Sequence, residues 1–154
     1  MQEILKASQV VFESIIHYPE IQISAGQATF LQGASGCGKS TLLKLLNGTL
    51  SPHSGTIYYE GTDIESLDTI QLRRKVLLAG QSVYLFRGTI LDNFIRYHTY
   101  RGSEPPETEQ LDAFLSLCCV DFPLDANCNN MYGGERQRVY IAVALSLAPK
   151  VLML

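Results

Sequence analysis

The segment Gly33–Thr41 reads GASGCGKST and fits the pattern G-x-x-x-x-G-K-[ST]. Its glycines let backbone N–H groups approach an anion closely, because a side chain would block that approach. The helix expected after the loop points its positive N-terminal end at the same anion. In this pattern Lys39 reaches the outer phosphates and the Ser40 hydroxyl ligates Mg²⁺. The sequence therefore predicts a loop that binds the phosphates of a nucleoside triphosphate, with ATP and Mg²⁺ as the expected ligands.

A second glycine motif lies at Met131–Arg138, which reads MYGGERQR. Its Gly133-Gly134 pair is expected to open a helix, whose free N–H groups and positive dipole make another anion-binding arrangement. By itself this motif is weak evidence, because any helix N-terminus has these properties. Together with the phosphate loop earlier in the chain, it becomes strong evidence for a second anion-binding site.

Strands and helices must hold these motifs in place, and hydrophobic patterning predicts where those strands and helices lie. A short apolar run at Ala28–Gln32 is predicted as a buried strand that leads into the phosphate loop. Lys39–Leu46 is predicted as a helix that ends near Gly48, and Glu60-Gly61 as a tight turn. Further helices are predicted at Leu67–Lys75, Thr89–Tyr97, Glu107–Cys119 and Glu135–Ala148, and further strands at Thr56–Tyr59, Val76–Ala79 and Val151–Leu154.

The predicted domain organisation is a single α/β domain with an inserted helical subdomain. Residues 1–86 and 149–154 are assigned to the α/β core, and residues 87–148 to the helical subdomain with the Gly-Gly helix. The last helix begins polar and becomes apolar all round, which is typical of a buried helix.

Composition narrows the class of protein. The 154 residues are 46% hydrophobic and 18% charged, as expected for one globular domain. The net charge of −3 does not favour binding to nucleic acid, and the basic run at 73–75 is interpreted as a solvated helix face. The four cysteines include no C-x-x-C pair, and no secretory signal opens the chain, so free thiols in a reducing cytoplasm are expected. No run of about 20 apolar residues is present, so the chain is expected to be soluble by itself.

The order of the motifs resembles the ATP-binding domain of ABC transporters over essentially the whole chain. Gly33–Thr41 matches that family's Walker A motif, and Met131–Arg138 is similar to its signature, usually written LSGGQ. Gln81 sits where the family has its Q-loop glutamine, and Val151–Leu154 resembles the hydrophobic start of Walker B. The sequence around residues 36–44 and 85–93 is similar to that of subunits that serve metal or iron export permeases, although the permease determines the cargo.

The resemblance implies a P-loop NTPase core of ABC-ATPase type, with ATP and Mg²⁺ as cofactors. Ser40 and Gln81 would contact the metal ion, and Phe12 would be the aromatic residue that stacks on adenine. Tyr18 competes with Phe12 for that role, and ordinary core packing is an alternative for both. The implied nucleotide-binding residues are Phe12, Gly33, Ala34, Ser35, Gly36, Cys37, Gly38, Lys39, Ser40, Thr41, Gln81, Tyr132, Gly133, Gly134 and Glu135.

The resemblance also implies two partners. The family pairs two such domains head to tail, so Gly133, Gly134 and Glu135 would face a phosphate bound by a second ATP-binding subunit. A membrane permease would be the other partner, and the chain would then work on the cytoplasmic face of the plasma membrane.

Two of the departures from the family pattern limit what the resemblance implies. Tyr132 stands at the signature serine position, where a bulky phenol cannot make the same short contact with a γ-phosphate. After Leu154 the family would continue with the Walker B aspartate, a catalytic glutamate and a histidine that senses the γ-phosphate, so we expect a truncated chain with weak or absent ATPase activity. The acidic residues Asp63, Asp68 and Asp92 are interpreted as turn or helix-surface residues, and no catalytic residue is assigned.

The leading interpretation is therefore an ATP-binding subunit that couples ATP binding and hydrolysis to transport through a permease. A soluble ABC-type ATPase outside transport is one alternative, although Gly133 follows Thr41 by only 92 positions and the segment between them lacks the coiled coil of repair relatives. A non-catalytic nucleotide-binding or interaction module is another. A small-molecule P-loop kinase would leave Gln81 and the Gly-Gly helix unexplained.

Overall fold

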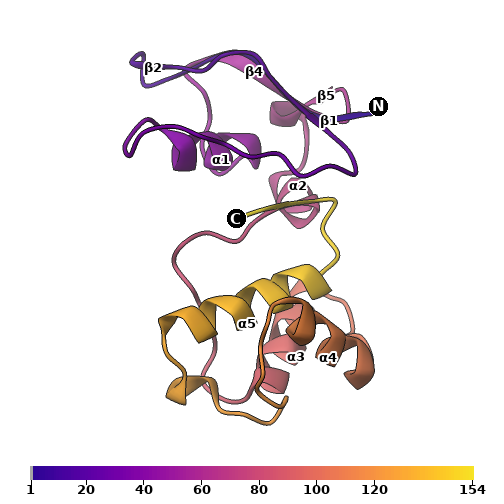
Figure 1. The fold of residues 1–154 in the computed structure, drawn as a ribbon. Helices are drawn as coiled ribbons and strands as arrows, with labels where there is room; N and C mark the ends of the chain where they lie inside the picture. Colours follow the sequence, from indigo (N-terminus) through magenta and orange to yellow (C-terminus); the bar gives the residue numbers. More distant parts are fainter. Residues whose placement is uncertain (1) are drawn as a thin grey trace. The chain divides into compact units, whose positions relative to one another are not determined.

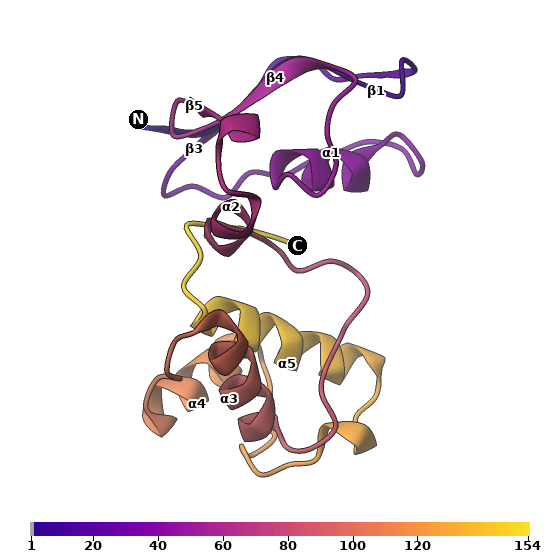
Figure 2. The ribbon, with the colours of Figure 1, turned by 180° about the vertical axis from the view of Figure 1, so that it is seen from behind.

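The computed structural model describes residues 2–154, and the chain separates into two compact units. The first unit ends at Leu78, and the second runs from Ala79 to Leu154. Figure 1 and Figure 2 show the elements of each unit from opposite sides.

The first unit contains an antiparallel sheet centred on the long strand β1. Leu5 of β1 lies opposite Ile23 on one side and Tyr59 on the other, so neighbours flank this strand on both edges. Sequence patterning does not predict β1 to β3, because Lys6, Ser8 and Gln9 interrupt the apolar run. The strands are β1 (Glu3–Phe12), β2 (Ile16–His17), β3 (Ile21–Ser24), β4 (Ser54–Tyr59) and β5 (Thr62–Asp63).

Two helices lie on the same side of this sheet in both views. Helix α1 (Lys39–Leu46) has the predicted bounds, and it buries Leu42, Leu45 and Leu46, which recur at helical spacing. Helix α2 (Thr69–Lys75) begins after Asp68, whose carboxylate accepts a hydrogen bond from the Gln71 N–H at 2.8 Å. The Arg73 guanidinium donates to the Gly48 carbonyl at 2.7 Å, which ties α2 to the end of α1.

The turns of the first unit follow their sequence signals. Glu60 and Gly61 have φ values of 48° and 77°, which fits the left-handed geometry of a two-residue hairpin turn. Strand β5 leads into a 3₁₀ turn, η1 (Ile64–Ser66), where the Asp63 carboxylate accepts a hydrogen bond from the Glu65 N–H at 3.0 Å. Strand β6 (Val76–Leu78) follows α2 as predicted. Asp63 and Asp68 therefore act as turn and helix caps, which confirms their interpretation.

The predicted strand at Ala28–Gln32 is wrong. The structure assigns no regular element to these residues, and the Phe30 side chain is 85% exposed. A strand needs a neighbour to pair its backbone groups, and among the described strands none pairs with this segment. The apolar run therefore predicted both the burial and the local structure of this segment wrongly.

The second unit is mainly helical. Its elements are α3 (Ile90–Arg101), α4 (Thr108–Leu117), the 3₁₀ turn η2 (Cys128–Asn130), α5 (Gly133–Ser146) and β7 (Val151–Met153). Phe94, Leu111 and Val143 belong to a core that the three helices share. From Val139 to Leu147 no residue of α5 or its end is exposed, so the predicted change from a polar start to a buried helix is confirmed.

Helix α3 has well-defined ends. Thr89 and Asp92 form a capping box, with the Thr89 hydroxyl accepting from the Asp92 N–H at 3.0 Å and the Asp92 carboxylate accepting from the Thr89 N–H at 2.8 Å. These hydrogen bonds lower the pKa of the Asp92 carboxyl. At the other end Gly102 adopts a φ of 73°. Asp92 is thus a helix cap, which agrees with its interpretation as a turn or helix-surface residue.

A buried histidine joins α3 to α5. The His98 ring is 4% exposed, with Nε2 3.1 Å from the Ser146 hydroxyl and Nδ1 3.0 Å from the Ser103 hydroxyl. Burial lowers the pKa of His98, and the nearby Arg101 charge lowers it further. The folded state therefore favours the neutral ring, whereas the unfolded chain binds a proton at a higher pH.

We expect the second unit to lose stability as the pH falls below about 6.5, the ordinary pKa of histidine. Above that pH both states are neutral at this site; below it, protonation favours the unfolded chain. Urea denaturation followed by helical circular dichroism at pH 7.5 and 5.5 would measure the change. His98→Gln should reduce this dependence, because it removes the buried ring that titrates. An unchanged pH dependence in His98→Gln would contradict the assignment.

Candidate functional site

The phosphate loop is an exposed segment that enters α1 through two left-handed glycines. Gly36 and Gly38 have φ values of 80° and 92°, which side chains rarely tolerate. Residues 33–37 are exposed, so the backbone of the loop faces solvent. The loop therefore has the open, glycine-dependent backbone that its sequence predicts.

The start of α1 offers N–H groups to an anion. The first turn of an α-helix leaves its N–H groups without intrahelical acceptors, and here that turn begins at Lys39, Ser40 and Thr41. The residue before the helix is Gly38, and no side chain caps the helix from that position. An external anion can therefore supply the missing acceptors.

The Lys39 side chain lies across the loop. Its ammonium nitrogen donates to the carbonyls of Gly33 at 2.7 Å and Ala34 at 2.9 Å, and it lies 3.8 Å from the Cys37 sulfur. These contacts hold a positive charge beside the exposed loop backbone. A Cβ added to Gly33 would lie 2.7 Å from that sulfur, so a larger residue there would require the Cys37 side chain to move. This geometry fits the binding of a polyphosphate.

Of the two candidate aromatic residues, the structure places Tyr18 on the loop. Its hydroxyl donates a hydrogen bond of 2.9 Å to the Gly38 carbonyl. Phe12 is the last residue of β1, pairs with Ile16 and is half-buried. The role of Phe12 as an adenine contact stays a prediction.

The second predicted cluster lies in the second unit. Tyr132 is 82% exposed and directly precedes α5, and Gly133 and Gly134 form an exposed first turn. The Glu135 carboxylate accepts a hydrogen bond from the Tyr132 N–H at 2.8 Å. The motif therefore opens a helix as predicted, and its phenol projects into solvent.

Gln81 is exposed and precedes α3 in the chain. Among the described residues no group of three or more histidine, cysteine, aspartate or glutamate side chains could hold a metal ion. The assignment of Ser40 and Gln81 as Mg²⁺ contacts stays a prediction. In the part of the chain that the structure describes, no helix combines the length and apolar character needed to cross a membrane.

An aromatic cluster after Gln81 is a feature that sequence patterning misses. The Phe86 ring contacts Tyr84 at 5.0 Å and Tyr97 at 5.4 Å between centroids, and it stacks on Tyr100 at 5.6 Å. The Arg96 guanidinium lies 5.4 Å from the same ring. The only sequence signal was the spacing of aromatic residues along the end of the loop and one face of α3.

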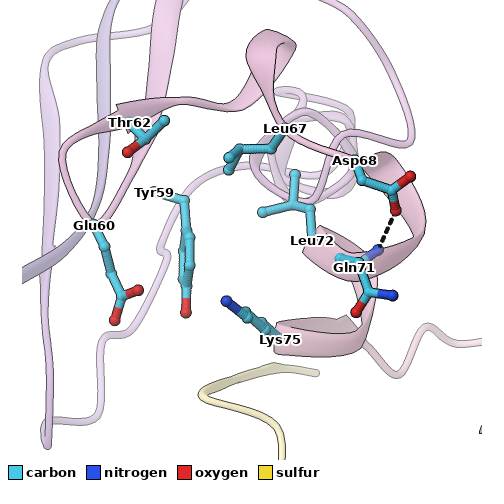
Figure 3. A pocket seen from close by; sticks show the side chains of 8 residues that line it. All are labelled: Tyr59, Glu60, Thr62, Leu67, Asp68, Gln71, Leu72 and Lys75. Carbon is cyan, nitrogen blue, oxygen red and sulfur yellow. Dashed lines mark hydrogen bonds between the residues drawn. The ribbon is translucent and has the colours of Figure 1, made fainter.

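A pocket of about 250 Å³ in the first unit lies apart from the predicted site residues (Figure 3). Among the residues that line the pocket, the Lys75 ammonium lies 5.8 Å from the centre of the Tyr59 ring. Burial raises the pKa of Tyr59, and the neighbouring Glu60 raises it further. The lining residues are Tyr59, Glu60, Thr62, Leu67, Asp68, Gln71, Leu72 and Lys75.

Comparison with known proteins gives consistent relatives. The chain is 36% identical over 140 residues to the probable iron export ATP-binding protein FetA of Escherichia coli (strain K12), covering 91% of this chain and 62% of FetA. CbiO1 from Clostridium perfringens, part of the ABC transporter complex CbiONQ, superposes with a TM-score of 0.79 at 25% identity, covering 99% of this chain and 64% of that one. A bacterial Atm1-family ABC exporter with ATP bound gives 0.83 at 27% identity, covering 98% and 29%. The chain spans less than two thirds of each of these proteins.

The sequence profile of the ABC transporter family matches residues 16–154, which include the phosphate loop, Gln81 and the Gly-Gly helix. The structural matches confirm the predicted fold class, because they cover nearly the whole chain with its strands and helices. The chain therefore belongs to the ABC transporter family, with the fold of that family's ATP-binding domain.

Proposed function

We propose that this chain binds Mg²⁺-ATP at Gly33–Thr41 and serves as the ATP-binding subunit of an ABC transporter, coupling nucleotide binding and hydrolysis to a permease. The observation that carries the proposal is the start of α1, where uncapped N–H groups meet the Lys39 ammonium on one exposed loop. Membership of the ABC transporter family supports ATP as the nucleotide.

The backbone of the loop and the Lys39 side chain are expected to bind different phosphates. Backbone N–H groups at the start of α1 would donate hydrogen bonds to oxygens of the inner phosphates, aided by the helix dipole. The Lys39 ammonium would exchange its two carbonyl acceptors for oxygens of the outer phosphates, which are stronger acceptors because they carry charge. The exposed loop leaves the rest of the nucleotide in contact with solvent or with a partner.

Ser40 and Gln81 are proposed to hold Mg²⁺. Hydroxyl and amide oxygens are hard ligands of the kind that Mg²⁺ takes, usually with several waters and phosphate oxygens. When bound, Mg²⁺ neutralises charge on the phosphates. The exposed positions of Ser40 and Gln81 are compatible with such a role.

The proposed partners are a second ATP-binding subunit and a membrane permease. The exposed first turn of α5 supports head-to-tail pairing, because Gly133 and Gly134 leave its N–H groups accessible to a phosphate held by another subunit. The similarity to FetA makes metal export the first cargo class to test. The proposed place of action is the cytoplasmic face of the membrane, through the permease.

Tyr132 favours a second candidate, a nucleotide-binding module that does not turn ATP over. Its phenol is 82% exposed at the start of α5, where it would meet an incoming subunit before the helix backbone does. A pair of subunits held apart at this position would bind ATP without completing a site for hydrolysis.

Isothermal titration with Mg²⁺-ATP, together with phosphate-release kinetics, tests both candidates. Binding with turnover supports the transporter subunit. Binding without turnover supports the second candidate if the Tyr132→Ser variant then hydrolyses ATP. Absence of saturable ATP binding would contradict both. Co-purification with a membrane permease would then separate a transporter subunit from a soluble ABC-type ATPase.

A further inference from the structure

Tyr18 contacts the phosphate loop at the residue where the loop becomes a helix. Its hydroxyl donates to the Gly38 carbonyl at 2.9 Å, and the Leu42 N–H donates to the same carbonyl at 2.9 Å. The Gly38 carbonyl is thus shared between the first hydrogen bond of α1 and a side chain from outside the helix. No sequence motif of the phosphate loop includes residue 18.

Side chains also pack closely around Gly38. A Cβ added to Gly38 would lie 2.8 Å from the Tyr18 hydroxyl oxygen and 3.4 Å from the Ile16 side chain. The end of the β1–β2 hairpin therefore rests directly on the junction between loop and helix. A side chain at position 38 would displace the Tyr18 hydroxyl, and the φ of 92° would strain it as well.

The other end of Tyr18 is anchored in the sheet. Its backbone N–H donates to the Val10 carbonyl of β1 at 2.9 Å, and Val10 is 1% exposed. Next to it, His17 pairs with Val11. The phenol therefore extends from a backbone fixed in the sheet, so it can hold the loop in one place.

The phenol remains a donor at neutral pH. Burial raises the pKa of Tyr18, and the Thr41 side chain lowers it by a smaller amount. The hydroxyl therefore keeps its proton under physiological conditions.

We propose that Tyr18 is a positioning residue of the phosphate loop, because its hydrogen bond to the Gly38 carbonyl, together with the one from the Leu42 N–H, fixes the direction of the Lys39 N–H. The two groups belong to one planar trans peptide unit, so the N–H points opposite to the carbonyl. Holding the carbonyl on the Tyr18 side aims the Lys39 N–H away from Tyr18, toward the anion that the helix start would bind. The inference rests on the proposed function of the loop.

Tyr18→Phe removes the hydroxyl and keeps the ring. We expect it to weaken binding of Mg²⁺-ATP and of inorganic tripolyphosphate by about threefold to tenfold, the range for one lost hydrogen bond. The preference for ATP over GTP should not change, because the base does not take part. Isothermal titration of both ligands measures the effect, and Tyr58→Phe in β4 provides a matched control that should bind as the unsubstituted chain does.

A purely structural role gives a different result. It would lower the unfolding midpoint of the ligand-free protein and leave the dissociation constant of the folded protein unchanged. Tripolyphosphate affinity equal to that of the unsubstituted chain would overturn the inference. If the unsubstituted chain shows no binding that depends on Lys39, the proposed function fails first, and the role of Tyr18 falls with it.

Discussion

Replacing Lys39 with alanine is expected to weaken binding of Mg²⁺-ATP by about tenfold to a hundredfold, the range for losing a charged hydrogen-bond donor. The ammonium lies across the phosphate loop, 2.7 Å from the Gly33 carbonyl and 2.9 Å from the Ala34 carbonyl. A polyphosphate in the loop would meet this charge at close range. The loss should be larger for ATP than for AMP, because Lys39 serves the outer phosphates.

The chain offers a matched control in the same helix. Lys44 is exposed in the last turn of α1, so Lys44→Ala makes the same change of charge away from the loop. We expect near-normal ATP affinity in this variant and an unfolding midpoint for Lys39→Ala close to that of the unsubstituted chain. Equal effects of the two substitutions would mean that net charge, rather than the position of Lys39, determines binding.

Local signals in the sequence predicted much of the fold. Helix α1 has the predicted bounds because Leu42, Leu45 and Leu46 recur at helical spacing directly after the glycine-rich loop. The helices predicted to begin at Leu67 and Thr89 start within two residues of those positions, where Asp68 and the Thr89–Asp92 pair cap them. These features depend on neighbours in the chain, so a single sequence contains them.

Features that depend on distant partners were harder to predict. The strand predicted at Ala28–Gln32 failed because pairing, which patterning cannot supply, decides whether an apolar run forms a strand. Strand β1 was missed for the opposite reason, since its neighbours in the sheet stabilise a sequence interrupted by polar residues. Tyr18 reaches Gly38 across 20 residues, and no local pattern indicates this contact.

Asn93 illustrates the same limit, and its replacement by alanine is expected to destabilise the second unit by about 2–4 kcal/mol. Its side chain is fully buried. The Asn93 Oδ1 accepts a hydrogen bond from the Phe86 N–H at 2.8 Å, and Nδ2 donates to the carbonyls of Phe86 at 3.1 Å and Thr89 at 2.9 Å. Alanine would leave these backbone groups without their partner and open a cavity beside Cys128.

Urea denaturation followed by helical circular dichroism measures the loss, with Asn129→Ala as a control at an exposed asparagine. We expect the control to stay within about 0.5 kcal/mol of the unsubstituted chain. Tyr97 still donates to the Tyr84 carbonyl at 2.6 Å in either variant, so part of the segment that follows Gln81 keeps its attachment to α3.

Asn93→Leu separates the hydrogen bonds from the volume that the side chain fills. Leucine has a similar size and greater hydrophobicity, so it should recover part of the packing energy. It cannot accept from the Phe86 N–H or donate to the two carbonyls, and burying such groups without partners is costly. We therefore expect Asn93→Leu to remain clearly less stable than the unsubstituted chain. Full recovery would show that Asn93 acts by filling space, and that the bonds to Phe86 are not what holds this segment on α3.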